Sequence, residues 1–335
     1  MKSVLVTGAS GFVGSTVVEA CIENNLKTFA AIRKSSNPRY LKDERINIVY
    51  LNLNDKEELK TQLQELINKE GLIHYIIHVA GITKAKKLSD FWEHNYNTTI
   101  NLVDAILELN IPIEKFVQVS SLAAFGPGDA KTLLPRSLND APLPNTTYGK
   151  SKLKAEEYVR SKDNLPWLIF RPTGIYGPKD VDYFVYFKTI NRKFEPYIGC
   201  KEQYLTFIYS KDLANLIVSS LSTPIVKKSY FVSDGDVYTS KEFANITKNI
   251  LKVKTFRLVV PKFIVKIIAY TLDFLYKPFG RAPLLNVDKY NILTSINWKC
   301  EVEPLFKDFN FKPQYNLEKG ITETIKWYKE NGWLK

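Results

Sequence analysis

The chain has 335 residues, of which 45% are hydrophobic and 13% aromatic, and this ordinary globular composition excludes a disordered or low-complexity protein. Its length suits one large domain, or a nucleotide-binding domain joined to a smaller one. The formal net charge of +12 comes from scattered lysines without an arginine-rich stripe, so we expect no nucleic-acid partner and leave an anionic partner and a solvated basic surface open.

Short β-branched runs alternate with helical patterns, which indicates a parallel sheet with helices on its faces. The predicted strands cover residues 4–6, 28–32, 47–51, 75–79, 116–120 and 167–170, and the predicted helices cover residues 12–24 and 56–68. A stretch with four prolines, residues 127–144, is expected to be a loop. The fold class is therefore α/β: a doubly wound parallel sheet with a smaller, mainly helical C-terminal region.

After residue 178 the pattern becomes less regular and richer in aromatic residues, which predicts a change of domain. We assign residues 1–178 to one domain, which the glycine motif described below indicates to be the NAD(P)-binding domain, and residues 179–204 and 236–335 to the substrate-binding region. Phe207–Tyr209 and Tyr230–Val232, inside a segment near residues 205–235, are expected to return to the nucleotide-binding domain. An amphipathic pattern predicts a terminal helix over residues 320–333.

Cysteines and histidines are too few and too scattered for a disulfide framework or a metal site. The three cysteines are far apart in sequence, which fits a reducing cytoplasm. His74 and His78 flank an apolar run, which favours core histidines over zinc ligands, so no metal is expected. We expect a cytoplasmic protein, because no signal-peptide pattern and no apolar stretch of membrane-spanning length stand in the sequence.

A glycine-rich turn, Thr7-Gly8-Ala9-Ser10-Gly11-Phe12-Val13-Gly14, joins the first strand to the first helix. Glycine allows a tight turn and a close approach of backbone N–H groups to a pyrophosphate, and a helix N-terminus favours the anion. Glycine motifs are common, but this one has the required strand before it and helix after it. We therefore expect a dinucleotide to contact the residues of the turn: Gly8, Ser10, Gly11, Phe12, Val13 and Gly14.

The end of the second strand distinguishes the two nicotinamide cofactors. An acidic residue there binds the ribose hydroxyls of NAD, whereas a basic residue accommodates the 2′-phosphate of NADP. Here the strand is followed by Arg33 and Lys34 without an acid, so the sequence favours NADP(H) through Arg33 and leaves NAD(H) open. A pair of solvated loop charges is the alternative interpretation.

Tyr148 and Lys152 stand at i and i+4, which puts both side chains on one face of a helix. A phenol titrates at about pH 10, and a neighbouring ammonium is expected to lower the pKa of Tyr148 toward neutrality. Ser121 follows the predicted fifth strand, where its hydroxyl can hold a substrate oxygen beside the tyrosine. A tyrosine–lysine pair alone is frequent by chance, but its combination with the glycine turn and the serine is specific.

These residues resemble the extended short-chain dehydrogenase/reductase family, or NAD-dependent epimerase/dehydratase family, over nearly the whole chain. The motifs are the glycine turn, His78-Val79-Ala80-Gly81, Ser120-Ser121, the Tyr148–Lys152 pair, Arg171-Pro172-Thr173-Gly174 and the segment from Phe207 to Ala214. The resemblance implies a Rossmann-type fold and nicotinamide chemistry. It implies that Tyr148 is the acid–base group, that Lys152 contacts the phenol and the nicotinamide ribose, and that Ser121, five residues before Gly126, holds the substrate oxygen. It also matches Asn95 to a frequent family asparagine and implies cofactor contacts from Asn52, Leu53, Ala80, Gly81, Pro172 and Thr173.

Departures from the family pattern separate its branches. Sugar dehydratases of the family carry an acidic pair after the catalytic serine, where this chain has Leu122-Ala123, so dehydration is not expected. Nucleotide-sugar epimerases carry a pyrophosphate-binding arginine where this chain has Tyr204, although Lys201 or Arg281 could substitute. We expect a carbonyl reductase or alcohol dehydrogenase acting on a hydrophobic or lipid-like small molecule, with a nucleotide-sugar 4-epimerase and a non-catalytic nucleotide-binding scaffold subunit as alternatives.

The segment from Pro261 to Lys277 has an apolar helical pattern in which Lys262, Lys266, Asp273 and Lys277 share one narrow stripe. Apolar residues cover the rest, although a surface helix needs only about a third of its circumference apolar. Four interpretations are open: burial between domains, a lining for an apolar substrate, a homodimer face, and peripheral contact with a membrane surface. A similar helix in the 3β-hydroxysteroid dehydrogenase-like and dihydroflavonol reductase-like branches favours an apolar substrate.

Overall fold

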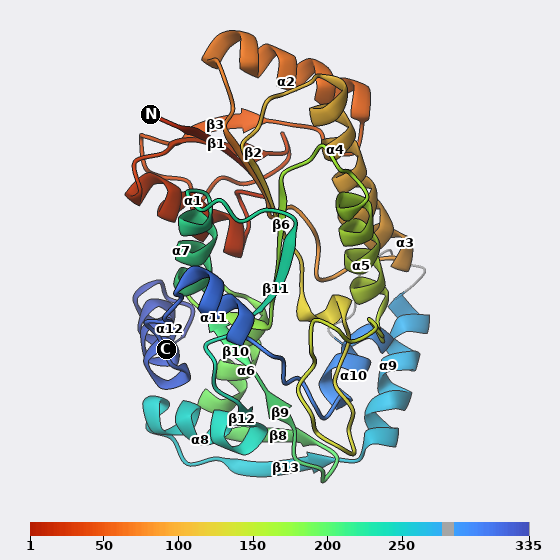
Figure 1. Cartoon of the computed structure of the whole chain (residues 1–335). Coiled ribbons are helices and arrows are strands. Elements are labelled where there is room, and N and C mark those ends of the chain that lie inside the picture. The colour runs from red at the N-terminus through yellow and green to blue at the C-terminus, as the bar shows by residue number, and fades with distance from the viewer. Residues whose placement is uncertain (277–284, 335) are drawn as a thin grey trace.

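The computed structural model describes residues 1–276 and 285–334, and a seven-stranded parallel sheet lies at its centre (Figure 1). The strand order is β11-β6-β5-β4-β1-β2-β3. The strands are β1 Ser3–Thr7, β2 Lys27–Ile32, β3 Asn47–Tyr50, β4 Tyr75–His78, β5 Lys115–Val119, β6 Trp167–Pro172 and β11 Lys228–Val232. The order reverses between β1 and β4, and ligands of open parallel sheets bind beyond the carboxyl ends of the strands at such a point.

Helices cover both faces of this sheet (Figure 1). One face packs against α1 (Phe12–Glu23) and α7 (Ser210–Ser220), and the other against α2 (Lys56–Glu70), α4 (Thr98–Glu108) and α5 (Thr147–Arg160). Side chains alternate between the faces, so Val4 and Val6 of β1 pack in one core and Leu5 in the other. A strand covered on both sides has to be continuously apolar, which is why these strands are readable in the sequence.

A smaller region lies below the carboxyl ends of the strands in Figure 1. Its core is rich in aromatic side chains and is surrounded by α6 (Asp182–Asn191), α8 (Ser240–Leu251) and α12 (Leu317–Glu330). Three two-stranded sheets pair β7 (Gly174–Tyr176) with β10 (Phe207–Tyr209), β9 (Tyr204–Leu205) with β12 (Tyr238–Thr239), and β8 (Phe194–Ile198) with β13 (Phe256–Val260). The remaining elements are α3 (Leu88–Phe91), η1 (Trp92–Asn97), η2 (Leu122–Ala124), α9 (Lys262–Tyr276), α10 (Val287–Thr294) and α11 (Glu303–Phe309).

The predicted fold class and the predicted strands of the main sheet are confirmed, with a difference at one of the two return segments. Tyr230–Val232 joins the main sheet within β11, but Phe207–Tyr209 pairs with β7 in a separate sheet because β11 occupies the place beside β6. The terminal helix begins three residues before Gly320, because Asn316 caps it by accepting the backbone N–H of Lys319 at 2.9 Å.

The apolar helix predicted over residues 261–277 is present as α9, and Lys277 lies outside the described residues. Burial between domains is wrong for this helix, because only Val265 and Ala269 of α9 are buried. Sequence periodicity could not reveal this, since both a buried helix and an outward-facing one can be apolar on most sides. Among the described residues, none of the helices combines the length and apolarity needed to cross a bilayer.

Candidate active site

The glycine turn lies at the carboxyl end of β1, where the strand order reverses. Gly8 adopts a left-handed φ of +68°, and its carbonyl oxygen accepts the backbone N–H of Gly11 at 3.0 Å. A Cβ atom on Gly14 would lie 2.1 Å from that same oxygen, so α1 can approach β1 only with glycine at this position. Gly11 is the exposed N-cap of α1, with Ser10, Phe12 and Val13 half-buried around it.

The loop after β4 lies directly against this turn. A Cβ atom on Gly8 would lie 2.8 Å from the Ala80 backbone, and the Ala80 N–H donates to the Thr7 hydroxyl at 3.3 Å. His78 Nδ1 is hydrogen-bonded to the same hydroxyl at 2.8 Å, and His78 Nε2 to the Thr99 hydroxyl at 3.0 Å. Burial lowers the pKa of His78 to about 3, so the ring is a neutral core histidine that joins β1, β4 and α4.

Lys152 projects from α5 toward the end of the same loop. Its Nζ lies 3.8 Å from the position of a Cβ on Gly81 and donates to the Val119 carbonyl oxygen at 2.7 Å. Burial lowers the pKa of this ammonium to about 8, against an opposing effect of Glu156. Asn95 of η1 holds the loop from the other side, because its Oδ1 accepts the Ile82 N–H at 2.7 Å and its Nδ2 donates to the Ile82 carbonyl at 3.1 Å.

Tyr148 is half-buried one helical turn before Lys152, at the start of α5. Burial raises the pKa of its phenol, and a hydrogen bond with the Ser121 side chain opposes that rise. This direction is the reverse of the one expected from the lysine spacing, because desolvation of the phenolate exceeds the stabilisation that its neighbours provide. A phenol of raised pKa is protonated near neutral pH and can act as a proton donor.

The two serines after β5 have different partners. The Ser120 hydroxyl is buried and donates to the Glu156 carboxylate, which Arg171 also binds in a buried ion pair of 2.6 Å. Ser121 is half-buried and caps η2 by accepting the Ala123 N–H at 3.1 Å. The structure therefore brings Ser121, and not Ser120, to the tyrosine.

Asp288 was not identified from the sequence, although it contacts the tyrosine directly. Its carboxylate accepts the backbone N–H of Tyr148 at 3.1 Å and the Thr147 hydroxyl at 3.4 Å. This contact places α10 beside the start of α5 (Figure 1). No local motif signals it, because the two residues are 140 positions apart.

Comparison with known proteins identifies the family. A family model described as the NAD dependent epimerase/dehydratase family matches residues 4–232. The chain belongs to this family. Members are NAD-dependent oxidoreductases and epimerases, so the chain is an enzyme of this class, and the predicted family and enzyme class are confirmed.

Two curated relatives are similar to this family member over nearly their whole length. The ceramide reductase of Caulobacter vibrioides is 25% identical, over 99% of this chain and 96% of that protein. The UDP-glucose 4-epimerase of Vibrio cholerae is also 25% identical, over 96% of this chain and 94% of that protein. The crystal structure of gox2253 has the same fold, with a TM-score of 0.81, 21% identity and full coverage of both chains.

The site fits the nicotinamide dinucleotide that the family implies. Gly11 caps α1 without a side-chain hydrogen bond, and the first turn of α1 carries no acid, so this helix end suits a pyrophosphate. Within the described residues, the Thr173 hydroxyl after β6 is buried without a hydrogen-bond partner and is available to a ligand. Pro172 ends β6 immediately before it.

The remaining predicted cofactor residues lie at the ends of β2 and β3. Arg33 follows β2 and is exposed. Asn52 and Leu53 follow β3, where the Asn52 N–H donates to Gln62 at 2.8 Å and the Leu53 carbonyl accepts the Asn101 side chain at 2.9 Å. These residues follow the two strands at one edge of the sheet, and they lie separately from the group formed by Tyr148, Lys152 and Gly81.

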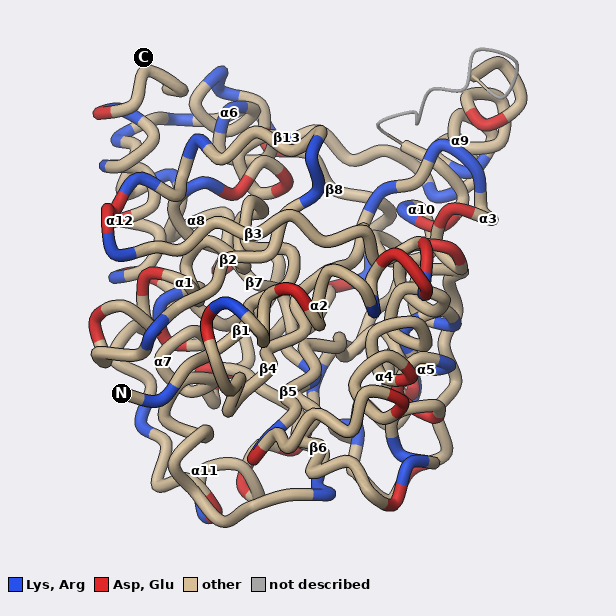
Figure 2. The backbone as a smooth tube through the Cα atoms, turned by 90° about the horizontal axis from the view of Figure 1, so that it is seen from above, with Lys and Arg blue, Asp and Glu red and all other residues tan. Residues whose placement is uncertain are grey.

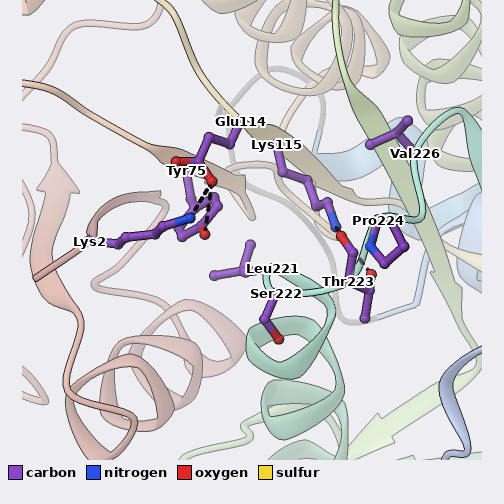
Figure 3. Close-up of a pocket in the computed structure, with 9 residues that line it drawn as sticks. All are labelled: Lys2, Tyr75, Glu114, Lys115, Leu221, Ser222, Thr223, Pro224 and Val226. Carbon is purple, nitrogen blue, oxygen red and sulfur yellow. Dashed lines mark hydrogen bonds and ion pairs between the residues drawn. The ribbon is translucent and has the colours of Figure 1, made fainter.

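A cavity of about 320 Å³ at the opposite end of the sheet is distinct from this site (Figure 3). Lys2 pairs with Glu114 at 2.5 Å, and Lys115 donates to the Ser220 and Thr223 carbonyl oxygens at 2.6 Å each. The cavity lies at the amino ends of β1, β4 and β5, whereas the glycine turn, Tyr148 and Lys152 gather at the carboxyl ends. We therefore assign it no part in the chemistry.

Proposed function

We propose that the enzyme transfers a hydride between NADP(H) and a carbonyl or alcohol of a hydrophobic, lipid-like substrate, with Ser121, Tyr148 and Lys152 as the reacting side chains. The observation that carries the proposal is the contact of the Tyr148 phenol with Ser121, beside a lysine that borders the loop against the glycine turn. In this proposal residues 1–178 hold the cofactor, and residues 179–204 and 236–335 bind the substrate.

Each side chain has a separate task. A nicotinamide cofactor held at the glycine turn by Gly8, Gly11 and Gly14 would supply or remove the hydride. The Ser121 hydroxyl donates a hydrogen bond to the substrate oxygen, and Tyr148, kept protonated by burial, donates its proton to that oxygen during reduction. Lys152, oriented by the Val119 carbonyl, stabilises the phenolate that remains.

Several features support an apolar substrate. Leu122 and Ala123 follow Ser121 and cannot move protons, and Tyr204 stands where a nucleotide-sugar enzyme of the family carries arginine. Lys201 is exposed, and Arg281 lies outside the described residues. The similarity to a ceramide reductase supports a lipid-like ketone, whereas the equal similarity to a UDP-glucose 4-epimerase keeps sugar epimerisation as the second candidate.

The cofactor preference rests on Arg33. No acidic residue follows β2 until Asp43, and Arg45 already binds that carboxylate at 2.7 Å. Arg33→Ala should weaken NADPH binding about tenfold to hundredfold, the value of one charge-assisted hydrogen bond, and leave NADH binding unchanged. Arg39→Ala, an exposed arginine of the same loop, is the matched control. Tighter binding of NADH than of NADPH by the unmodified enzyme would reject the preference, while leaving the reaction class in place.

The test of substrate class is a direct comparison of turnover. Long-chain methyl ketones, a ketosteroid and UDP-glucose are offered with NADPH and with NADH, and both nicotinamide absorbance and sugar isomer are followed. The proposal expects NADPH oxidation with an apolar ketone and no conversion of UDP-glucose. Formation of UDP-galactose without net change of the cofactor would establish the epimerase instead.

A further inference from the structure

Helix α9 turns its apolar side chains toward solvent. Phe274, Phe263 and Ile267 are 77%, 64% and 61% exposed, values ordinarily found for charged surface residues. We call the exposed apolar side of α9 its outer face, which consists of Phe263, Ile264, Ile267, Ile268, Phe274 and Leu275. At about 100° per residue these six side chains cover about 140° of the helix. A contiguous apolar surface of this kind marks an interaction site.

The polar groups of α9 attach it to the body of the enzyme. Lys262 donates to the Thr294 carbonyl at 3.0 Å, and Asp273 accepts the backbone N–H of Val287 at 3.0 Å, so both ends of α10 are held. With Val265 and Ala269 buried beneath, the helix is anchored through a narrow side, and the residues of its outer face are between 37% and 77% exposed. This is the reverse of an ordinary amphipathic surface helix.

Helix α9 is connected to the proposed active site through α10, on the side away from its outer face. Asp273 of α9 binds Val287 of α10, and the following residue, Asp288, binds the backbone of Tyr148 at 3.1 Å. Figures 1 and 2 both place α10 beside α9, and in Figure 2 α9 projects from one corner of the molecule. A surface that covers α9 would therefore lie on an element joined to the reacting tyrosine through α10.

We propose that α9 lies flat on an anionic lipid surface, with its outer face inserted among the acyl chains, and that the apolar substrate passes between this membrane and Tyr148. The inference rests on the function proposed above. With 15 residues α9 is about 22 Å long, too short for the roughly 30 Å core of a bilayer, so it lies on the membrane and does not span it.

Charge favours lipid over a second copy of the chain. Residues 252–276 contain five basic residues and one acidic residue, and Lys252, Lys254, Arg257 and Lys266 are exposed. Anionic headgroups would neutralise this basic excess, whereas a second copy of the chain would bring a further net charge of +12.

Vesicle co-sedimentation tests the proposal. Vesicles of phosphatidylcholine with phosphatidylglycerol should sediment the wild-type enzyme, and binding should weaken at high salt and on phosphatidylcholine alone. Phe263→Ser/Phe274→Ser should reduce binding by at least about tenfold without changing the thermal midpoint, since both rings are exposed. The matched control, Leu72→Ser/Leu134→Ser, removes exposed leucines elsewhere and should bind as wild type.

Three results would overturn membrane docking. They are absence of wild-type binding, equal binding by the Phe263→Ser/Phe274→Ser variant, and a wild-type dimer that this variant converts to monomers in light scattering. Turnover of the best water-soluble ketone without vesicles separates the two proposals. If the wild-type enzyme and the Phe263→Ser/Phe274→Ser variant reduce this ketone equally but neither binds vesicles, docking fails and the proposed function stands. If the enzyme binds vesicles but Tyr148→Phe reduces the ketone at the wild-type rate, the proposed function fails and docking of α9 to lipid stands.

Discussion

Gly14 and Gly11 stand three residues apart, and the structure predicts that substitution of Gly14 mainly affects stability whereas substitution of Gly11 mainly affects cofactor binding. A Cβ on Gly14 would lie 2.1 Å from the Gly8 carbonyl oxygen and 2.7 Å from its carbonyl carbon, both backbone atoms. Relief requires β1 and α1 to separate by roughly 1 Å. Because both elements are held in the core, Gly14→Ala should lower the free energy of unfolding by about 3 kcal/mol, the upper end for overpacking.

Gly11 is the position at which substitution should affect ligand binding more than stability. It is exposed with an extended backbone, φ −80° and ψ 175°, which any residue adopts, and its Cβ would lie 3.3 Å from the Gly8 oxygen. Gly11→Val should cost about 1 kcal/mol of stability as a poorer N-cap. It should weaken NADPH binding at least about hundredfold, because the side chain fills the approach of the pyrophosphate.

Urea unfolding followed by tryptophan fluorescence measures stability, and titration with NADPH measures affinity. A Gly14→Ala protein as stable as wild type would refute the packing argument. A folded Gly11→Val protein with unchanged NADPH affinity would refute the placement of the cofactor at this turn.

Two further predictions concern buried charges. The pKa of Lys152 is lowered to about 8, so its ammonium is lost as the pH rises through that value, and kcat/KM should fall above about pH 8. An active Lys152→Arg enzyme should not show this fall, because arginine stays charged. A flat wild-type profile up to about pH 10 would contradict the assignment. Glu156→Gln leaves Arg171 without its buried carboxylate and should lower the free energy of unfolding, measured in urea, by about 3 kcal/mol or more. The double variant Glu156→Leu/Arg171→Met removes both charges and should recover most of that loss. A double variant less stable than Glu156→Gln would contradict this reasoning and show that the ion pair is net stabilising.

The main sheet and the glycine turn could be predicted because their signals are local. β1 is buried at all five positions, so its apolar run is readable directly, and Gly8 precedes a helix that starts where the motif requires. The pairing of Tyr148 with Lys152 follows from one helical turn of α5.

The features that could not be predicted from the sequence depend on tertiary contacts. The pKa of Tyr148 is raised and not lowered, because spacing in sequence reveals the lysine but not the burial of the phenol. Asp288 reaches Tyr148 from a helix far along the chain, with no motif around it. The apolar periodicity of residues 261–277 predicted a helix that is apolar on most sides. It could not predict which side of α9 faces the rest of the enzyme, because that depends on α10, through the hydrogen bond from the Val287 N–H to Asp273.

The most direct test of the proposed chemistry is Tyr148→Phe, which removes the ionisable hydroxyl and keeps the ring. The control is Tyr158→Phe on the same helix, whose hydroxyl binds Asp104 away from the site. Steady-state turnover is measured with the best substrate from the ketone and UDP-sugar screen, alongside NADPH affinity. We predict that Tyr148→Phe lowers kcat by about 10²–10⁴ with cofactor affinity nearly unchanged, while Tyr158→Phe keeps wild-type turnover. A Tyr148→Phe enzyme that works at close to the wild-type rate would contradict the assignment of Ser121, Tyr148 and Lys152 as the reacting group.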